Sequence, residues 1–383
     1  MSASASRRAR GAARGGSRGG APAFREDLLE SLSNAAGVSG DEHRVREIVA
    51  AAVRERVDTL QVDAMGSLVA TIGLEGPGAR NGNARPNGTA RKGRPPHVML
   101  CAHMDEVGFM ITAIEKEGRL RFRRAGGIDP RILVGQVFRV GSSGVRGVTG
   151  ILPPHLVSHN EEEKVIAADD LYIDIGASSR EDALRHVAIG DTAVFDTTYE
   201  AWGSVRKGKA FDDRAGCAVL ASLVQERPPV PVTAVWSVQE EVGLRGATAA
   251  ARRVAPDLAI VLEGTASGEM PGAGPEESAP RMGGGPTLTV HDRSLMADAR
   301  LVDLLRRTAA ERRIPTQWKR PGVGGTDAGR IALSGAGVPS AVVSVPCRYI
   351  HAPAAYLDVR DARRTVELVW HALRAIGKEW SES

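Results

Sequence analysis

The sequence predicts an α/β fold into which a β-rich module is inserted. Four short apolar runs are typical of parallel strands buried on both faces of a sheet, and they lie at residues 97–102, 232–238, 258–262 and 340–345. Between the first two runs, Gly and Pro break the chain into short β-rich segments, a spacing that favours a small barrel or sandwich. The module therefore interrupts a single α/β domain.

The chain begins with a segment that cannot build a core. Residues 1–23 are rich in Arg, Gly and Ser and contain no acid, since the first acidic residue is Glu26. This composition is typical of a flexible tail. It also resembles an organellar transit peptide, but it lacks the apolar segment of a secretory signal. We predict a disordered tail over residues 1–23.

Three elements are expected between the tail and the first buried strand. Ser39 and Glu42 have the spacing of a helix capping box, and the residues that follow have helical periodicity. Residues 62–71 predict a strand, a turn and a second strand. Residues 75–96 have no periodicity and predict an exposed loop. Residues 24–106 are assigned to the first part of the α/β domain.

The inserted module is predicted over residues 107–200, with one helix at 179–186. Its expected β segments lie at residues 108–113, 120–122, 137–140, 145–151 and 171–175. From Val205 onwards strands and helices alternate again, up to a C-terminal helix at 362–379. Residues 201–383 are therefore assigned to the second part of the α/β domain.

Composition excludes several classes of protein. Lys+Arg of 50 against Asp+Glu of 46 gives a net charge of +4, and much of the excess lies in the tail, so charge predicts no nucleic-acid groove. No apolar stretch approaches the length of a membrane span. The 3 cysteines lie beside apolar residues, which suits buried thiols in a reducing cytoplasm.

Each buried run leads to residues that can bind a metal. In chain order these are His103 with Asp105, Glu240 with Glu241, then Glu263, and finally His351. Ligands gather at the carboxyl ends of strands in open α/β sheets. Two ionised acids side by side after a buried strand are costly unless cations neutralise them. The pattern predicts a metallohydrolase.

A pair of divalent ions about 3.5 Å apart requires a bridging carboxylate and terminal ligands on each ion. Asp212 is the bridging candidate, although Asp212 and Asp213 before an apolar helix also suit an N-cap. The terminal candidates are His103, Glu241, Glu263 and His351. Nitrogen and oxygen ligands without thiolate suit Zn²⁺, Co²⁺ or Mn²⁺. Glu240 then remains as general base on the water that the metals hold, and Asp105 as the group that orients His103.

At these motifs the sequence resembles the M42 metallo-aminopeptidases, a family of glutamyl and leucyl aminopeptidases with endoglucanase-like names among its members. The matching segments are 37–40, 102–108, 209–216, 239–247, 324–329 and 348–351. The resemblance implies a metallo-exopeptidase catalytic domain with a mixed sheet flanked by helices, plus an inserted small β-barrel-like domain. It also implies hydrolysis of N-terminal residues from short peptides.

The resemblance assigns roles by position. His103, Asp212 and Glu263 should hold one ion, and Asp212, Glu241 and His351 the other, with a cis peptide bond between Asp212 and Asp213. Many members have Asp where this chain has Glu263.

Further roles follow from the same resemblance. Thr326 and Asp327 are candidates for substrate contact, or for capping a helix. The inserted module resembles the family's dimerisation domain, and dimers there assemble into dodecamers.

Two other functions compete with the aminopeptidase. An endoglucanase-type glycosidase could use paired carboxylates. However, 4% aromatic content offers no sugar-stacking platform, and His103 and His351 would have no role. A non-catalytic assembly protein of the same fold is the third reading, and a missing ligand would favour it. All of the expected ligands are present.

Overall fold

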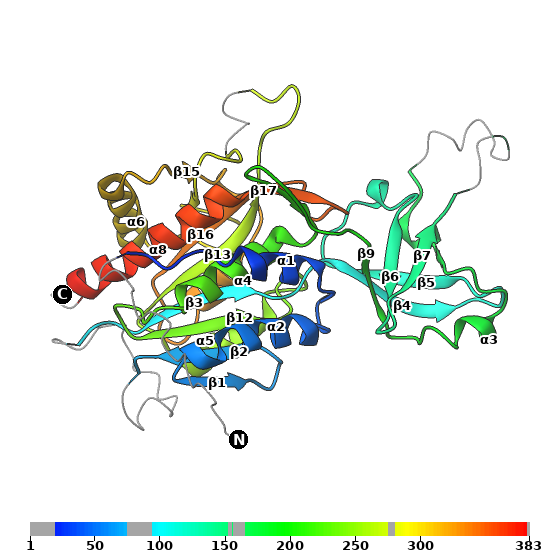
Figure 1. Ribbon diagram of the computed structural model, residues 1–383, viewed down its shortest axis with the longest axis horizontal. Coiled ribbons are helices and arrows are strands. Elements are labelled where there is room, and N and C mark those ends of the chain that lie inside the picture. The colour runs from blue at the N-terminus through cyan, green and yellow to red at the C-terminus, as the bar shows by residue number, and fades with distance from the viewer. Residues whose placement is uncertain (1–19, 75–93, 152–154, 156–164, 275–279, 381–383) are drawn as a thin grey trace, which may run out of the picture.

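The computed structural model describes residues 20–74, 94–151, 155, 165–274 and 280–380. Most of the predicted tail and of the predicted loop at 75–96 lies outside these residues. A large sheet flanked by helices forms one body, and a smaller β body stands to one side of it (Figure 1). In the described part of the chain, no helix is long and apolar enough to cross a membrane.

The four predicted buried strands lie side by side and are parallel. Their order across the sheet is β12 (Val232–Ser237), β3 (Val98–His103), β13 (Leu258–Ala266) and β16 (Ser340–Arg348). Nearly every side chain in them is buried, which explains why their sequences are continuously apolar. Because the strands are parallel, their carboxyl ends meet at one edge of the sheet, as predicted.

Antiparallel strands extend the sheet on both sides, so that it is mixed and 11-stranded over the described residues. On one side lie β2 (Leu68–Ile72) and β1 (Thr59–Val62), and on the other β17 (Ala355–Asp358), β11 (Val205–Gly208) and β10 (Glu200–Trp202). The short strands β14 (Thr287–Thr289) and β15 (Gln317–Trp318) branch from β16. The predicted strand, turn and strand are confirmed by β1 and β2.

Helices cover both faces of the sheet, each through an apolar stripe. One face carries α1 (Glu26–Asn34), α2 (His43–Val53), α4 (Phe211–Leu223), α6 (Ala299–Arg312) and α8 (Val359–Glu379). The other carries α5 (Arg245–Val254) and α7 (Asp327–Ala332), and a 3₁₀ turn, η1 (Arg54–Arg56), follows α2. The predicted C-terminal helix begins earlier than expected, because the Asp358 carboxylate caps its first turn by accepting from the Arg360 amide (2.9 Å).

The predicted capping box is wrong. Helix α2 begins after Glu42, and no side chain caps its first turn. Ser39 instead donates its hydroxyl to the Asp105 carboxylate (2.7 Å), and Glu42 accepts from the backbone of Gln239 (3.0 Å). Both polar side chains therefore have partners distant in the sequence, and Glu42 also accepts from the nearby Gly40 amide (2.8 Å).

The inserted module is a closed barrel, in agreement with the predicted fold class. Around the barrel run β4 (Gly108–Ile114), β5 (Leu120–Ala125), β8 (Ile173–Asp174), β7 (Val145–Thr149), β6 (Val137–Val140) and β9 (Thr192–Phe195). The 3₁₀ turns η3 (Pro130–Ile132) and η5 (Ala168–Asp170) and the short helix α3 (Arg180–Ala183) complete it. The predicted boundaries at 107 and 200 stay a prediction.

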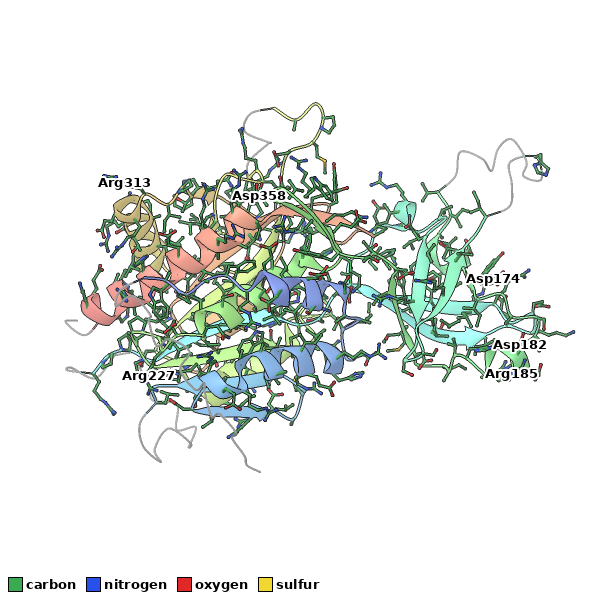
Figure 2. The ribbon with its side chains drawn as sticks, in the orientation of Figure 1. Asp174, Asp182, Arg185, Arg227, Arg313 and Asp358 are labelled. Atoms are coloured by element: carbon green, nitrogen blue, oxygen red, sulfur yellow. The ribbon has the colours of Figure 1, made fainter. Side chains whose placement is uncertain are left out.

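An aromatic cluster fills the barrel. The ring of Phe109 meets those of Phe122, Phe138 and Phe195 edge to face, at centroid distances of 5.1, 5.1 and 5.5 Å. Helix α3 lies within the predicted helix at 179–186 but is shorter. Asp182 and Arg185 mark the end of the barrel farthest from the sheet (Figure 2).

Candidate functional site

The sequence-predicted ligands meet at the carboxyl edge of the sheet. His103 ends β3, Glu263 lies within β13, and Glu240 and Glu241 occupy the turn after β12. Asp212 lies at the start of α4, and His351 lies in the turn between β16 and β17. Six side chains from five separate segments therefore converge, as the strand ends predicted.

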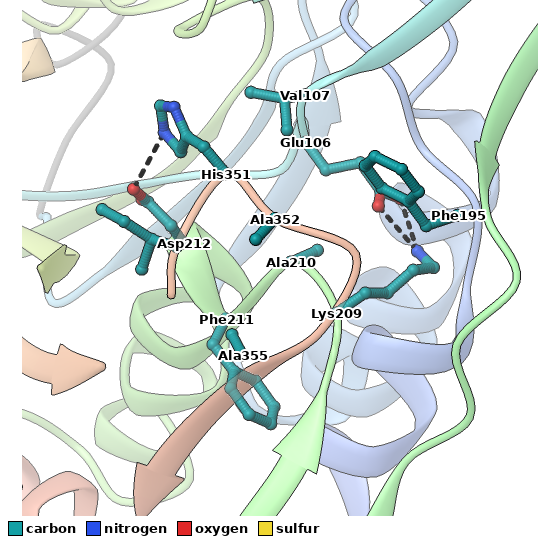
Figure 3. Close-up of a pocket in the computed structure, with 11 residues that line it drawn as sticks. Glu106, Val107, Phe195, Lys209, Ala210, Phe211, Asp212, His351, Ala352 and Ala355 are labelled. Carbon is teal, nitrogen blue, oxygen red and sulfur yellow. Dashed lines mark hydrogen bonds and ion pairs between the residues drawn. The ribbon is translucent and has the colours of Figure 1, made fainter. Parts of the chain in front are cut away.

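Asp212 lies between the two histidines. Its Oδ1 is 3.2 Å from Nε2 of His103. Its Oδ2 is 3.4 Å from Nε2 of His351, and Figure 3 shows this second contact. On the first side, Glu263 Oε2 lies 3.6 Å from His103 Nε2. On the second side, Glu241 Oε1 lies 3.2 Å from His351 Nε2. The site is thus two clusters that share one carboxylate.

The remaining predicted acid, Glu240, lies beside the first cluster. Its Oε2 is 4.0 Å from Nε2 of His103, and its carboxylate is largely buried. Glu240 is therefore within reach of a molecule held by either cluster.

The backbone at Asp212 is irregular in the way the resemblance implied. The peptide bond between Asp212 and Asp213 is cis, and both residues depart from helical dihedral angles. The two neighbouring carboxylates have different partners. Asp213 is fully buried and accepts from the amides of Gly216 (2.8 Å) and His103 (3.2 Å).

Each histidine is oriented through its other ring nitrogen. Nδ1 of His103 lies 3.1 Å from the carbonyl oxygen of Asp105 and 3.3 Å from its carboxylate. Nδ1 of His351 donates to the carbonyl of Gly127, in the loop that follows β5 of the barrel (2.9 Å). Both contacts leave Nε2 directed at the acids, which is how a metal-binding histidine is usually held. Asp105 therefore contacts the ring nitrogen that faces away from the acids, and its orienting role stays a prediction.

Burial of so many acids perturbs their protonation. Burial raises the pKa of Glu263 and of Glu240 well above the ordinary glutamate value, and nearby carboxylates raise it further. For His103, burial lowers the pKa, but Glu240, Asp105 and Asp212 outweigh it, so that its pKa is raised well above the ordinary value. The acids at this edge of the sheet therefore repel one another when they are ionised, and a bound cation would relieve that repulsion.

This donor set fits divalent cations. Oε1 of Glu263 is buried and has no hydrogen-bond partner among the described residues. Three groups of ligand atoms lie close enough to hold an ion: His103 with Glu240 and Glu241, His103 with Asp213 and Glu263, and Asp212 with Glu241 and His351. Imidazole and carboxylate donors suit Zn²⁺, Co²⁺ or Mn²⁺. Cations would relieve the repulsion between the acids and give the free oxygen of Glu263 a partner.

Thr326 and Asp327 lie beneath the surface and not in an open part of the site. Thr326 occupies the N-cap position of α7, but its hydroxyl contacts Asp292 (3.4 Å) and does not cap the helix. The Asp327 carboxylate accepts from the Ser237 hydroxyl (2.5 Å). Burial raises the pKa of Asp327 to about 6. These positions give the predicted substrate contacts no support, and those contacts stay a prediction.

Sequence reasoning missed a buried ion network beside the site. The Lys209 ammonium contacts both carboxylate oxygens of Glu106 at 2.6 and 2.8 Å (Figure 3), and the Arg214 guanidinium lies 3.3 Å from the same carboxylate. Burial lowers the pKa of Lys209 to about 8, against the opposing effect of Glu106. The network joins the segment after β3 to both sides of Asp212. Its only signal in the sequence was the basic residues that flank the acid pair.

Comparison with known proteins agrees with this geometry. The sequence profile described as M42 glutamyl aminopeptidase matches residues 82–368. The chain belongs to the M42 peptidase family. A lysyl aminopeptidase of Pyrococcus furiosus is 30% identical over 89% of this chain and 94% of its own length.

Solved structures extend the likeness to the whole fold. A TET aminopeptidase from a marine-sediment archaeon, Thaumarchaeota archaeon SCGC AB-539-E09, is 35% identical with a TM-score of 0.84, over 93% of this chain and 97% of that one. The TET1 peptidase of Pyrococcus horikoshii is 32% identical with a TM-score of 0.76, over 90% and 98%. The latter assembles into a tetrahedron or a large octahedral shell.

This M42 protein is therefore an aminopeptidase that hydrolyses peptides from their N-terminus, and its family is metal-dependent. The glycosidase reading is not supported, since it left both histidines without a role and they lie at the centre of the site. The assembly-only reading required a missing ligand, and all five predicted ligands lie at this edge of the sheet. The group of atoms around His103 and Glu263 that could hold an ion includes Asp213 and not Asp212, so the assignment of individual ligands stays a prediction.

Proposed function

We propose that this aminopeptidase works with two divalent ions that share Asp212. His103 and Glu263 complete the ligands of one ion, and Glu241 and His351 those of the other. The observation that carries the proposal is the position of Asp212, whose two carboxylate oxygens face one histidine each, at 3.2 and 3.4 Å. Zn²⁺ or Co²⁺ is the expected metal, with Mn²⁺ as a further candidate.

When bound, the ions act as Lewis acids on the scissile carbonyl and lower the pKa of water. The residues of the chain supply the proton transfer. Glu240 takes a proton from the attacking water and delivers it to the leaving amine. In the metal-free protein, burial and then neighbouring acids raise the pKa of Glu240. Asp105 keeps Nε2 of His103 directed at the ligands.

We also propose that residues 107–200 form a dimerisation domain and that dimers assemble into a dodecamer. The cross-strand neighbours Val137 and Val148 support this, because both are exposed on the outside of the barrel. The shells formed by the P. horikoshii relative support assembly as well. An enclosed active site would limit the substrates to short peptides, and the buried, unpaired cysteines suit a cytoplasmic protein.

Relatives differ in the N-terminal residue that they are named for, glutamyl for the family profile and lysyl for the P. furiosus enzyme. Activity is therefore tested with a panel of acidic, basic and apolar aminoacyl-p-nitroanilides, with Zn²⁺, Co²⁺ or Mn²⁺ added to metal-free protein. Glu240→Gln should lower kcat by about 100-fold or more and leave the bound metal unchanged. Glu47→Gln, an exposed position on α2, is the matched control. Retention of most activity by Glu240→Gln would exclude the proposed base.

A further inference from the structure

The turn that carries Glu240 and Glu241 is hydrogen-bonded, directly and through Asp105, to a loop near the start of the chain. This positioning loop, residues 37–42, is the last part of the connection between α1 and α2. From the contacts below, we infer that Ser39 and Glu42 in this loop are positioning residues that set Glu240 and Glu241 for the reaction. The inference rests on the proposed function, which gives those two acids their roles.

Asp105 is the first junction between the loop and the turn. Its Oδ1 accepts from the Glu240 amide (2.9 Å), and its Oδ2 accepts from the Glu241 amide (3.0 Å). The Ser39 hydroxyl donates to the same Oδ2 (2.7 Å) and is only 8% exposed. A carboxylate that receives a buried hydroxyl and two amides has one orientation. Ser39, together with Nδ1 of His103 at 3.3 Å from Oδ1, therefore helps to hold the Asp105 carboxylate in the plane that both amides contact.

Glu42 is the second junction. Its Oε1 accepts from the Gly40 amide within the loop (2.8 Å) and from the Gln239 amide in the turn (3.0 Å). The side chain is 4% exposed, and burial raises its pKa. Gln239 has a φ of 57°, in the left-handed region that side chains other than Gly rarely adopt. The turn therefore has an unfavourable backbone conformation at Gln239, the residue whose amide donates to Glu42.

The loop itself is anchored independently of the turn. The Gly37 carbonyl accepts from the Glu106 amide (2.9 Å), and the Asp41 carboxylate accepts from the Thr192 hydroxyl of the barrel strand β9 (2.7 Å). The loop is therefore a fixed support, and the turn is the part that moves when Ser39 or Glu42 is lost. No contact is recorded between either residue and the carboxylates of Glu240 and Glu241 in the described part of the chain, so Ser39 acts through the Asp105 carboxylate and Glu42 through the Gln239 amide.

This arrangement predicts which properties of the enzyme change when Ser39 or Glu42 is replaced. A misplaced Glu240 slows proton transfer, which lowers kcat. A misplaced Glu241 lowers the affinity for the ion that Glu241 and His351 bind. Contacts that orient metal ligands from outside the ligand set are worth about 10- to 100-fold in activity or metal affinity. Ser39→Ala and Glu42→Ala should each lower kcat by about that factor and change KM by less than about threefold.

The experiment compares these variants with matched ones. Glu42→Gln keeps an oxygen for the Gln239 amide and should recover most of the kcat that Glu42→Ala loses. Ser340→Ala also removes a buried serine hydroxyl bond (2.8 Å), at the start of β16 far from the ligand end, and should match the wild type. Metal bound after dialysis is measured for every variant. During dialysis, Ser39→Ala and Glu42→Ala should first lose the ion that Glu241 and His351 bind. The thermal unfolding midpoints of both variants should stay near that of Ser340→Ala.

Three results would overturn the inference: wild-type kcat and metal content in both alanine variants, a raised KM with unchanged kcat, or loss of kcat that only follows loss of the folded state. Equal loss in Glu42→Gln and Glu42→Ala would also count against it. The proposed function fails on a different result, full activity of Glu240→Gln. An inactive Glu240→Gln together with a fully active Ser39→Ala would reject this inference alone.

Discussion

Replacement of Asp327 by asparagine should stabilise the metal-free protein at neutral pH. The carboxyl group is 1% exposed and lies behind the site, on the first turn of α7. Oδ2 accepts from the Ser237 hydroxyl, but Oδ1 is buried and has no hydrogen-bond partner among the described residues. Ionisation of such a group is unfavourable, because its charge has lost its water without a full set of replacement donors.

The size of the effect follows from the pKa. Burial raises the pKa of Asp327 from 3.8 to about 6, with the Ser237 hydrogen bond acting in the opposite direction. Because the pKa is higher in the folded state, this group's contribution to stability is full below pH 3.8 and is lost as the pH rises through about 6. A difference of about two pKa units corresponds to about 3 kcal/mol. Asparagine is neutral throughout and escapes this loss.

The assay is urea unfolding of Asp327→Asn and of the wild type, at several pH values from 4 to 8. The two proteins should have similar stabilities near pH 4, and the variant should gain up to about 3 kcal/mol by pH 7.5. Asp292→Asn is the matched control. Its equally buried carboxylate accepts from the amides of Ser294 (2.7 Å) and Leu295 (2.8 Å), so asparagine should destabilise there. A less stable Asp327→Asn at pH 7.5 would refute the reasoning.

Three further outcomes are expected. Glu106→Gln leaves the buried Lys209 and Arg214 without their counter-charge, so it should lower the free energy of unfolding by about 3 kcal/mol or more. Urea denaturation measures this loss, and a loss below about 1 kcal/mol would show that stability does not depend on the network. A chelator should abolish hydrolysis of every aminoacyl substrate, with recovery on adding Zn²⁺, Co²⁺ or Mn²⁺, and chelator-resistant turnover would contradict a metal site. Val148→Glu, on the outer face of the barrel, should shift the protein to smaller species in sedimentation velocity, and an unchanged profile would place the interface elsewhere.

Much of the site was accessible from sequence because of how parallel strands are built. A strand buried on both faces is largely apolar along its length, so its carboxyl end is visible as the polar residues that follow the run. His103, Glu240 and Glu263 were identified in this way, and the structure brings them together. The closed barrel likewise follows from short β segments separated by Gly and Pro.

What the sequence could not predict depends on partners far apart in the chain. Ser39 and Glu42 have capping-box spacing, but Ser39 bonds to a residue 66 positions away, and Glu42 bonds to one 197 positions away as well as to Gly40. The carbonyl that orients His351 comes from Gly127, 224 residues earlier. Local spacing contains no information on which of two competing partners a side chain will choose, and tertiary packing decides it. For the same reason the burial of Asp327 was not foreseen.

In the proposed site, two ions share the Asp212 carboxylate. This sharing is tested most directly by measuring metal content and activity on the same samples. Metal-free protein is titrated with Zn²⁺ or Co²⁺, and bound metal per chain is determined by mass spectrometry alongside hydrolysis of an aminoacyl-p-nitroanilide. Activity should reach its maximum only as the second ion binds, and Asp212→Asn should bind at most one ion and be inactive. Full activity with one ion per chain, or two ions retained by Asp212→Asn, would contradict the shared carboxylate.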